Sequence, residues 1–368
     1  MTSWLPGYSG PPRIASVHID KGSDTDLAEQ MILSENTIRF SSDGQTISAD
    51  TEKLRSQLRS GDIVTVSDTG IISRIYENEE HNATVFLTGQ CNSNCVMCPC
   101  SDQERQYNTG FSDAWMSAYL NMLPDDVGTI VVTGGEPTLK TEQFFMVMET
   151  LAKRFPCTET LLLTNGRSLA SKALLHRMLE HCPPLMMAGI PLHGADAKSH
   201  DAITRASGSF RQTCMGIQNL LEREVAVEIR IVVSKLNVHE LDALADFISR
   251  VFPTVRIVTF MGLETLGNCA KNLGQVYVSH DESWPSVRSA IRRLMRQGIQ
   301  AQIYNYPLCA VDRGYWTLCR KSITPYKVRF PDICSDCEAK AQCGGFFSST
   351  LGVVKPQISP IRFDKELL

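Results

Sequence analysis

Three cysteines in one short stretch, Cys91, Cys95 and Cys98, carry the clearest chemistry of the sequence. They follow the pattern C-x3-C-x2-C, so one loop could gather three thiolates around an iron–sulfur cube. Full ligation normally uses four cysteines, so three would leave one iron open to a ligand. Zinc motifs favour paired C-x2-4-C units, and disulfide frameworks suit short secreted chains. The spacing therefore predicts a three-cysteine [4Fe-4S] site, with Cys100 as a spare thiol beside it.

Two polar segments further along the chain could hold a ligand of the open iron. Gly134 and Gly135 lack side chains, so a ligand could approach their backbone, and Glu136 adds a carboxylate that could accept hydrogen bonds from an ammonium group. Thr164 and Asn165 follow a Leu-Leu-Leu run and offer a hydroxyl and an amide. Each segment alone would also suit a tight turn.

The elements that must position these residues alternate between short apolar strands and amphipathic helices, which indicates a parallel α/β layer. The candidate strands are 84–87, 129–132, 160–163, 186–192, 225–233 and 255–260. The cysteine loop, the glycine segment, the Thr-Asn segment and His193-Gly194 follow the first four of these strands. Because active sites of parallel barrels lie at the carboxyl ends of the strands, these four segments are expected at one edge of the sheet.

Helical stripes of apolar residues predict the core-facing surfaces between the strands. The stripes are Phe144, Phe145, Met148, Leu151 and Phe155; Phe210, Cys214, Ile217, Leu220 and Leu221; Leu241, Leu244, Ile248 and Val251; and, within a helix over 284–299, Val287, Ile291, Leu294 and Met295. Cys157, Cys182 and Cys269 have no partner at ligand spacing and are expected to be structural.

Residues 1–80 are expected to form a small β-rich domain before a barrel over 81–280. Alternating residues predict one hairpin from 37–40 and 45–48 and a second from 63–66 and 71–76. This domain could dock a peptide, or it could only cover one end of the barrel.

Five cysteines gather in the segment 281–368, namely Cys309, Cys319, Cys334, Cys337 and Cys343. The last three form C-x2-C-x5-C, and a fourth ligand would complete a site for zinc or for a second [4Fe-4S] cluster. Cys309 follows a candidate strand over 301–304, which would hold it rigidly, whereas Cys319 lies among apolar neighbours. Cys309 is therefore the expected fourth ligand.

Composition limits the function classes. The 368 residues are 43% hydrophobic and 21% charged with a net charge of -4, and without a basic excess nucleic acid is not expected as a partner. No apolar run is long enough to cross a bilayer, and the N-terminus does not read as a signal peptide. A cytoplasmic protein is expected, in which the thirteen cysteines would stay reduced and available to metals.

The cysteine loop followed by Gly134-Gly135-Glu136-Pro137 resembles the radical S-adenosylmethionine (SAM) superfamily. The resemblance implies a partial (βα)6 barrel in which the open iron chelates SAM and an electron from the cluster cleaves it to a 5'-deoxyadenosyl radical. It implies that the segment of Glu136 holds the methionyl amino group and that Thr164 and Asn165 bind the ribose or carboxylate. Arg230, inside the fifth strand, would bind the SAM carboxylate or form an ordinary surface pair. These residues are expected to bind the cofactor, and the sequence does not identify a catalytic residue.

Two positions depart from the superfamily pattern. Met97 stands where many members have an aromatic residue near the adenine, so thioether packing would replace stacking. Pro191 lies in the fourth strand, where many members carry a SAM-binding serine, which leaves ribose recognition from that strand open. His193 could relay a proton or be a hydrogen-bonded structural histidine.

The tail resembles the SPASM and twitch auxiliary-cluster extensions, and residues 83–350 together resemble the radical SAM maturases of His-Xaa-Ser peptide systems. That resemblance rests on Cys91–Pro99, Pro191–Gly194, Arg230–Val233 and Cys309–Phe347. It implies a precursor peptide as substrate, a flavodoxin- or ferredoxin-type electron donor and a paired radical SAM maturase as partners. The alternatives are a glycyl-radical activase, a molybdopterin-precursor-type enzyme and, outside enzymes, a two-cluster electron carrier.

Overall fold

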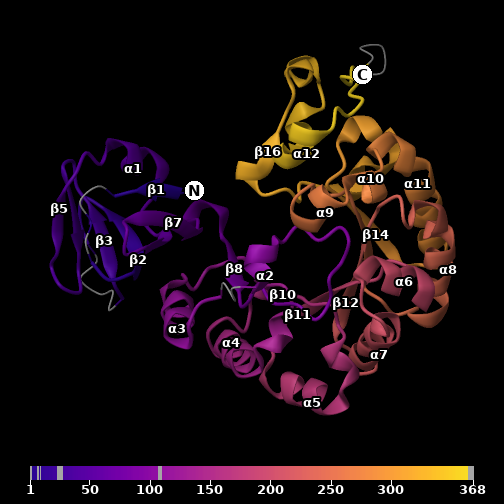
Figure 1. The fold of residues 1–368 in the computed structure, drawn as a ribbon, viewed down its shortest axis with the longest axis horizontal. Helices are drawn as coiled ribbons and strands as arrows, with labels where there is room; N and C mark the ends of the chain where they lie inside the picture. The colour runs from indigo at the N-terminus through magenta and orange to yellow at the C-terminus, as the bar shows by residue number, and fades with distance from the viewer. Residues whose placement is uncertain (1, 6–7, 9, 23–27, 107–109, 364–368) are drawn as a thin grey trace.

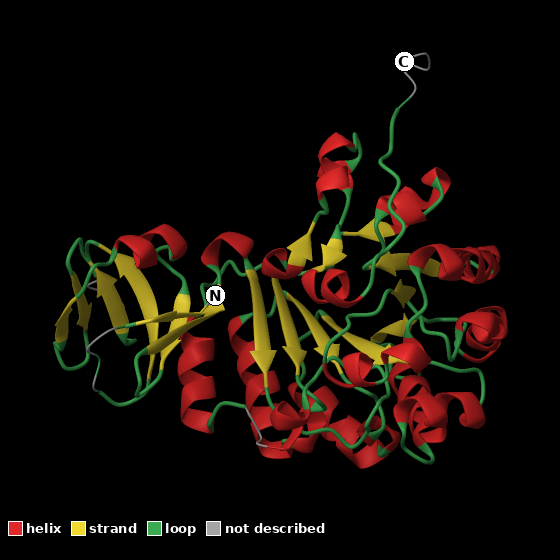
Figure 2. Ribbon diagram, turned by 45° about the horizontal axis from the view of Figure 1, so that its top comes forward, coloured by secondary structure: helices red, strands yellow, loops and turns green. Residues whose placement is uncertain are grey.

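The computed structural model describes residues 2–5, 8, 10–22, 28–106 and 110–363. A small sheet at the N-terminus lies beside a larger curved sheet whose outer face carries the helices, and the C-terminal segment lies at one edge of the larger sheet (Figure 1). Figure 2 shows strands of the larger sheet side by side, with most of the helices below and to the right of them. Within the described ranges, no helix is long and apolar enough to cross a membrane.

Seven strands form the N-terminal sheet, in the order β1-β7-β6-β2-β3-β4-β5. Both predicted hairpins are confirmed, since β4 pairs antiparallel with β5 and β6 with β7. The pattern did not indicate β2 and β3, because they have runs of buried residues instead of an alternation. The elements are β1 (Thr2–Trp4), β2 (Arg13–Ile19), β3 (Gln30–Leu33), β4 (Thr37–Phe40), β5 (Thr46–Ser48), α1 (Glu52–Gln57), β6 (Ile63–Val66) and β7 (Ile71–Tyr76).

Eight parallel strands form the larger sheet, in chain order from β8 to β15. The predicted α/β fold with a partial barrel is confirmed. β8 to β13 are the six predicted barrel strands, and β14 and β15, contributed by the segment after residue 280, extend the sheet by two. The strands are β8 (Asn82–Phe86), β9 (Thr129–Thr133), β10 (Glu159–Leu163), β11 (Met186–Pro191), β12 (Ala226–Val232), β13 (Ile257–Met261), β14 (Gln300–Tyr304) and β15 (Cys319–Arg320).

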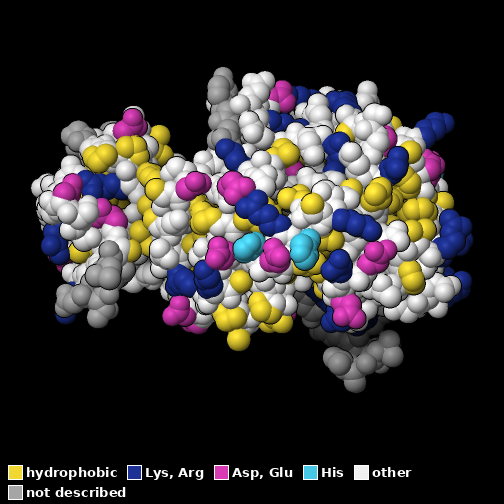
Figure 3. Space-filling model, turned by 90° about the horizontal axis from the view of Figure 1, so that it is seen from below, with side chains coloured by type: hydrophobic (Ala, Val, Ile, Leu, Met, Phe, Trp, Pro, Cys, Tyr) yellow, Lys and Arg dark blue, Asp and Glu magenta, His cyan; other side chains and the backbone are white. Residues whose placement is uncertain are grey.

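Helices between the strands bury the predicted apolar stripes against the sheet. Two stripe ends were wrong: Val251 is 40% exposed as the last residue of its helix, and Met295 is 52% exposed. On the face drawn in Figure 3, Lys and Arg side chains are interspersed with Asp and Glu. The helices are α2 (Asp102–Gln106), α3 (Asp113–Met122), α4 (Thr141–Arg154), α5 (Lys172–His181), α6 (Ala197–Thr204), α7 (Ser209–Leu221), α8 (Leu241–Val251), α9 (Gly267–Lys271), α10 (Leu273–Val276) and α11 (His280–Arg296).

The core of the barrel continues into both ends of the chain. Ile14, Ile63 and Tyr76 of the N-terminal sheet belong to the same buried cluster as the barrel strands, and so does Val311 of the tail. The tail adds an antiparallel pair and one helix, β16 (Val328–Arg329), β17 (Phe346–Phe347) and α12 (Ser348–Val353). Residues 354–363 then run without a helix or a strand.

Candidate iron-sulfur and cofactor site

The loop with the three cysteines follows β8, at the carboxyl edge of the parallel sheet, and each of its cysteines is partly buried. Two backbone hydrogen bonds join the start of the loop to the segment after β9, from Gly135 N–H to the Thr88 carbonyl at 2.6 Å and from Glu136 N–H to that of Gln90 at 2.8 Å. The end of α6 accepts two further backbone hydrogen bonds from residues 94 and 96. The segment after β9 thus fixes the start of the loop, and α6 fixes its middle.

The glycines after β9 are needed for contact with this loop. A Cβ atom at Gly134 would lie 2.5 Å from the Thr88 carbonyl oxygen, and one at Gly135 would lie 2.4 Å from the carbonyl oxygens of Gly89 and Gln90. The space beside the two Cα atoms is therefore filled by loop backbone. Sequence reasoning reserved that space for a ligand, whereas the structure gives it to the segment that carries the cysteines.

Glu136 is fully buried and joins the ends of β9 and β10. Its carboxylate accepts hydrogen bonds from the Thr138 hydroxyl at 2.6 Å, the Thr164 hydroxyl at 2.7 Å and the Asn165 backbone N–H at 2.7 Å. Burial raises the pKa of Glu136, while these hydrogen bonds act in the opposite direction. The carboxylate thus sets the position of residues 164 and 165, both of which the sequence had singled out.

The Asn165 side chain extends from this network toward the cysteine loop. Its amide donates to the Asn92 side-chain oxygen at 2.6 Å and lies 3.8 Å from the Cys91 sulfur. Glu136, Thr164, Asn165 and Cys91 are therefore brought together at adjoining strand ends. An amide beside a candidate iron ligand can hydrogen-bond either the thiolate or a molecule bound next to it.

Three residues that the sequence reasoning missed also hold the loop. Arg105 donates to the Ser93 carbonyl at 3.1 Å, Arg167 donates to the Ser93 hydroxyl at 3.0 Å, and Asn268 donates to the Cys95 carbonyl at 3.0 Å. Arg167 follows the Thr-Asn-Gly segment directly, and this adjacency was a usable signal. Asn268 is 173 residues from Cys95 in the chain, so no local pattern could have linked the two.

Cys100, expected to be a spare thiol, lies against the third cysteine of the motif. The pKa of Cys98 is lowered, and its hydrogen bond with Cys100 is the main cause. Burial raises this pKa, and the nearby Arg105 charge lowers it further. The same hydrogen bond raises the pKa of Cys100. Burial raises the pKa of Cys95 to about 12.

Met97 and Arg230 line one cavity of about 250 Å³ between the cysteine loop and the tail, together with Tyr304 and Lys327. Met97 is 5% exposed and packs on Ile203 and other apolar residues. The Arg230 guanidinium lies 5.7 Å from the centre of the Tyr304 ring, and its Nε is 3.7 Å from a Glu228 carboxylate oxygen. Arg230 therefore lines this cavity, as its interpretation as a partner of the SAM carboxylate required.

The donors around this cavity fit a carboxylate-bearing cofactor. The Nε of Arg230 is buried and has no hydrogen-bond partner among the described residues. A carboxylate would satisfy such a group, and an unsatisfied buried donor is otherwise costly. Arg230 could thus hold the carboxylate of SAM, and Met97 would contact its apolar parts; the Asn165 amide does not line this cavity and lies beside Cys91 instead.

His193 occupies a structural position at the end of β11. It is 2% exposed and stacks on His200 with a ring separation of 5.8 Å, and its backbone N–H donates to His200 Nδ1 at 3.2 Å. Burial lowers the pKa of His193 to about 3, so the ring stays neutral at neutral pH. This environment favours a structural role over proton relay, but the expected hydrogen bond to the ring is not seen, since His193 Nδ1 has no partner among the described residues.

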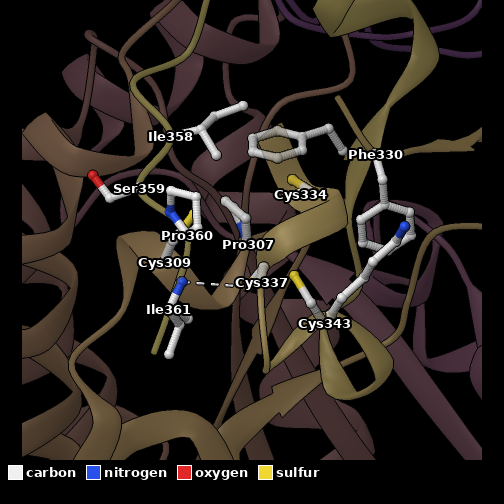
Figure 4. Close-up of a pocket in the computed structure, with 12 residues that line it drawn as sticks. Pro307, Cys309, Phe330, Cys334, Cys337, Cys343, Ile358, Ser359, Pro360 and Ile361 are labelled. Atoms are coloured by element: carbon white, nitrogen blue, oxygen red, sulfur yellow. Dashed lines mark hydrogen bonds between the residues drawn. The ribbon is translucent and has the colours of Figure 1, made fainter. Parts of the chain in front are cut away.

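Four of the five tail cysteines, Cys309, Cys334, Cys337 and Cys343, line one small cavity (Figure 4). Cys319 is not among the residues that line it; it lies in β15 and packs against the barrel core. Backbone N–H groups of Leu308 and Gly345 each lie 3.4 Å from the Cys343 sulfur. The structure thus gathers the four cysteines that the sequence favoured and separates the fifth.

The two cysteine groups provide the donor sets of iron–sulfur clusters. Three thiols in the loop fit a [4Fe-4S] cluster with one open iron, and four thiols around the tail cavity fit a fully ligated cluster. Four thiols would also suit zinc, so the donor set of the tail is compatible with either zinc or a cluster.

Residues 85–248, which hold the cysteine loop, the glycine segment and the strands up to α8, match the family model described as "Radical SAM superfamily". This stretch is a radical SAM domain. The superfamily implies a [4Fe-4S] cluster and SAM, in agreement with the three-cysteine loop and the donors beside it.

Curated relatives of the radical SAM domain include two enzymes of different function. AdoMet-dependent heme synthase of Nitratidesulfovibrio vulgaris is 25% identical over 154 residues, which are 42% of this chain and 40% of the relative. Mycofactocin maturase MftC of Mycobacterium ulcerans is 27% identical over 196 residues, 51% of each chain. The chain thus spans about half the length of the curated relatives it matches, or less.

Among solved structures, Streptococcus suis SuiB aligns over 66% of this chain and 53% of its own length, with 12% identity and a TM-score of 0.49. The same protein has been solved with its precursor peptide SuiA and aligns there with a TM-score of 0.48.

Proposed function

We propose that this chain is a radical SAM enzyme that modifies a ribosomally synthesised precursor peptide. The observation that carries the proposal is the pairing of two cysteine groups on one sheet, three in a loop fixed at the end of β8 and four around a cavity after β14. A two-cluster electron carrier would have no use for an open iron beside a polar cavity. The name of one relative, a mycofactocin maturase, agrees with peptide maturation.

In this function the side chains of the protein orient the cluster loop and the cofactor and exclude water from them. When bound, the cluster and SAM supply the reductive cleavage that begins radical chemistry. Glu136 orients Thr164 and Asn165, Arg105 and Arg167 fix the loop between the cysteines, and the buried surroundings of Met97 exclude water. Arg230 is the candidate partner of the SAM carboxylate.

The finer proposal is a maturase of a His-Xaa-Ser peptide system, supplied with electrons by a flavodoxin or ferredoxin and working beside a paired radical SAM maturase. Co-expression with a short neighbouring open reading frame that encodes His-Xaa-Ser repeats tests it. We expect a mass change in the peptide that disappears when Cys95 is replaced by alanine. An unmodified peptide, with SAM cleavage intact, would instead favour a glycyl-radical activase or a small-molecule enzyme.

The second cluster has its own test. Because Cys309 lines the tail cavity and Cys319 does not, Cys309→Ala should reduce iron from about eight to about four atoms per chain, whereas Cys319→Ser should leave it near eight. Iron analysis and Mössbauer spectra of anaerobically reconstituted protein give the measurement. The reverse pattern would make Cys319 the ligand, and zinc in the tail would exclude an auxiliary cluster.

A further inference from the structure

The last described residues of the chain return to the four tail cysteines. Residues 358–363, which we call the C-terminal strap, follow α12 after a short connection, and residues 358–361 line the cavity of Cys309, Cys334, Cys337 and Cys343. In Figure 4 the strap lies on the side of the cavity opposite Phe330. The strap contains no cysteine, and it brings backbone groups, apolar side chains and the Ser359 hydroxyl to the lining of this site.

The strap is attached next to one of the cysteines. Glu338 N–H donates to the Ile361 carbonyl at 3.0 Å, and Phe363 N–H donates to the Glu338 carboxylate at 2.5 Å. The Phe363 ring lies edge-on to Trp316 at 6.3 Å and receives the Arg313 guanidinium at 5.0 Å. These contacts hold the C-terminal half of the strap beside Cys337.

One backbone N–H group of the strap points at a cysteine sulfur. Ile361 N–H lies 3.4 Å from the Cys337 sulfur, and Ser359 lines the same cavity as Cys309. Pro360, between them, has no N–H, and together with Ile358 and Ile361 it covers the cavity with apolar atoms. One of the four thiols thus receives a donor from a segment that is itself not a ligand.

We propose that the C-terminal strap is a functional part of the auxiliary-cluster site, which shields the cluster from solvent and sets its reduction potential through the N–H group of Ile361. This inference rests on the proposed second cluster. Hydrogen bonds to cluster sulfurs and exclusion of water are established determinants of cluster potential. Since reduction adds negative charge, N–H donors stabilise the reduced form, and their loss lowers the potential.

Ile361→Pro in the full chain tests the donor. Proline removes the N–H that faces Cys337 but keeps the carbonyl that accepts from Glu338, and Ile361→Val is the matched control because it keeps the N–H and most of the apolar cover. We expect a lower auxiliary potential in the proline variant by EPR-monitored titration. The valine variant should match wild type, and the SAM-cluster potential should be unchanged in both.

A chain ending at Gln357 tests whether the strap protects the auxiliary cluster from solvent. It also tests the proposal if the proline variant does not fold. Its auxiliary cluster should lose iron to a chelator at least several-fold faster than wild type, whereas the SAM cluster of the same molecule should lose iron at the wild-type rate. Eight irons with unchanged auxiliary potential and chelation rate would overturn the role of the strap alone. Four irons in the wild-type protein would overturn the auxiliary cluster and the strap together.

Discussion

Cys95→Ala protein, reconstituted without oxygen and supplied with dithionite, should produce no 5'-deoxyadenosine from SAM. Three thiolates hold the predicted cluster, and Cys95 is the central one, tied to Asn268 through its carbonyl. Two remaining thiolates cannot retain a cubane that is open to SAM. The same loss is expected for Cys91→Ala and Cys98→Ala.

Chromatographic detection of 5'-deoxyadenosine measures this result, and iron analysis should show about four atoms fewer per chain. Cys157→Ala is the control, because Cys157 is exposed and remote from the loop in sequence. Undiminished cleavage by Cys95→Ala would remove the basis for a three-cysteine SAM-binding cluster.

Gly135→Ala is expected to disturb the cluster loop strongly, although it adds only one methyl group. The new Cβ would lie 2.4 Å from the carbonyl oxygens of Gly89 and Gln90, and these backbone atoms can move only if the loop moves with them. Forced overpacking of this kind costs about 1–3 kcal/mol. Because Cys91 follows Gln90 directly, we expect weaker iron retention and SAM affinity reduced by about 10- to 100-fold.

Calorimetric titration with SAM and iron analysis after gel filtration measure both effects. Gly274→Ala is the matched control: it is also a glycine outside the left-handed region, but a Cβ there would meet nothing within 4 Å. It should bind SAM as wild type does. If Gly135→Ala also retained wild-type iron and affinity, the contact with the loop backbone would have no functional weight.

Periodicity predicted the barrel well because its strands and helices repeat one local rule. Phe144, Met148 and Leu151 recur at helical spacing and are all buried, whereas Val251 and Met295 fit the spacing but lie at helix ends, where the sheet no longer covers them. β2 was not predicted because its first five residues are all buried, so the strand lacks the alternation of buried and exposed positions that the prediction relied on.

The candidate site was predictable where its residues are neighbours in sequence. The three loop cysteines, the glycine segment and the Thr-Asn segment could be found as motifs. The burial of Glu136 and its bond to Thr164 could not, because 28 residues separate them and only strand pairing brings them together. Asn268 is a more extreme case. It lies in α9, after β13, and its contact with Cys95 forms only because the fold brings α9 against the loop after β8.

The parallel pairing of β13 with β14, in the register Ile257↔Gln300, has a consequence for the modularity of this protein. The tail that holds the second cysteine group is not an appendage on a flexible linker, because its first strand completes the barrel sheet and Cys309 lies five residues after that strand. Cutting the chain after residue 280 would remove β14 and α11 and leave the edge of β13 unpaired. An unpaired strand edge promotes aggregation. We therefore expect the barrel to be stable only when it is expressed together with the tail.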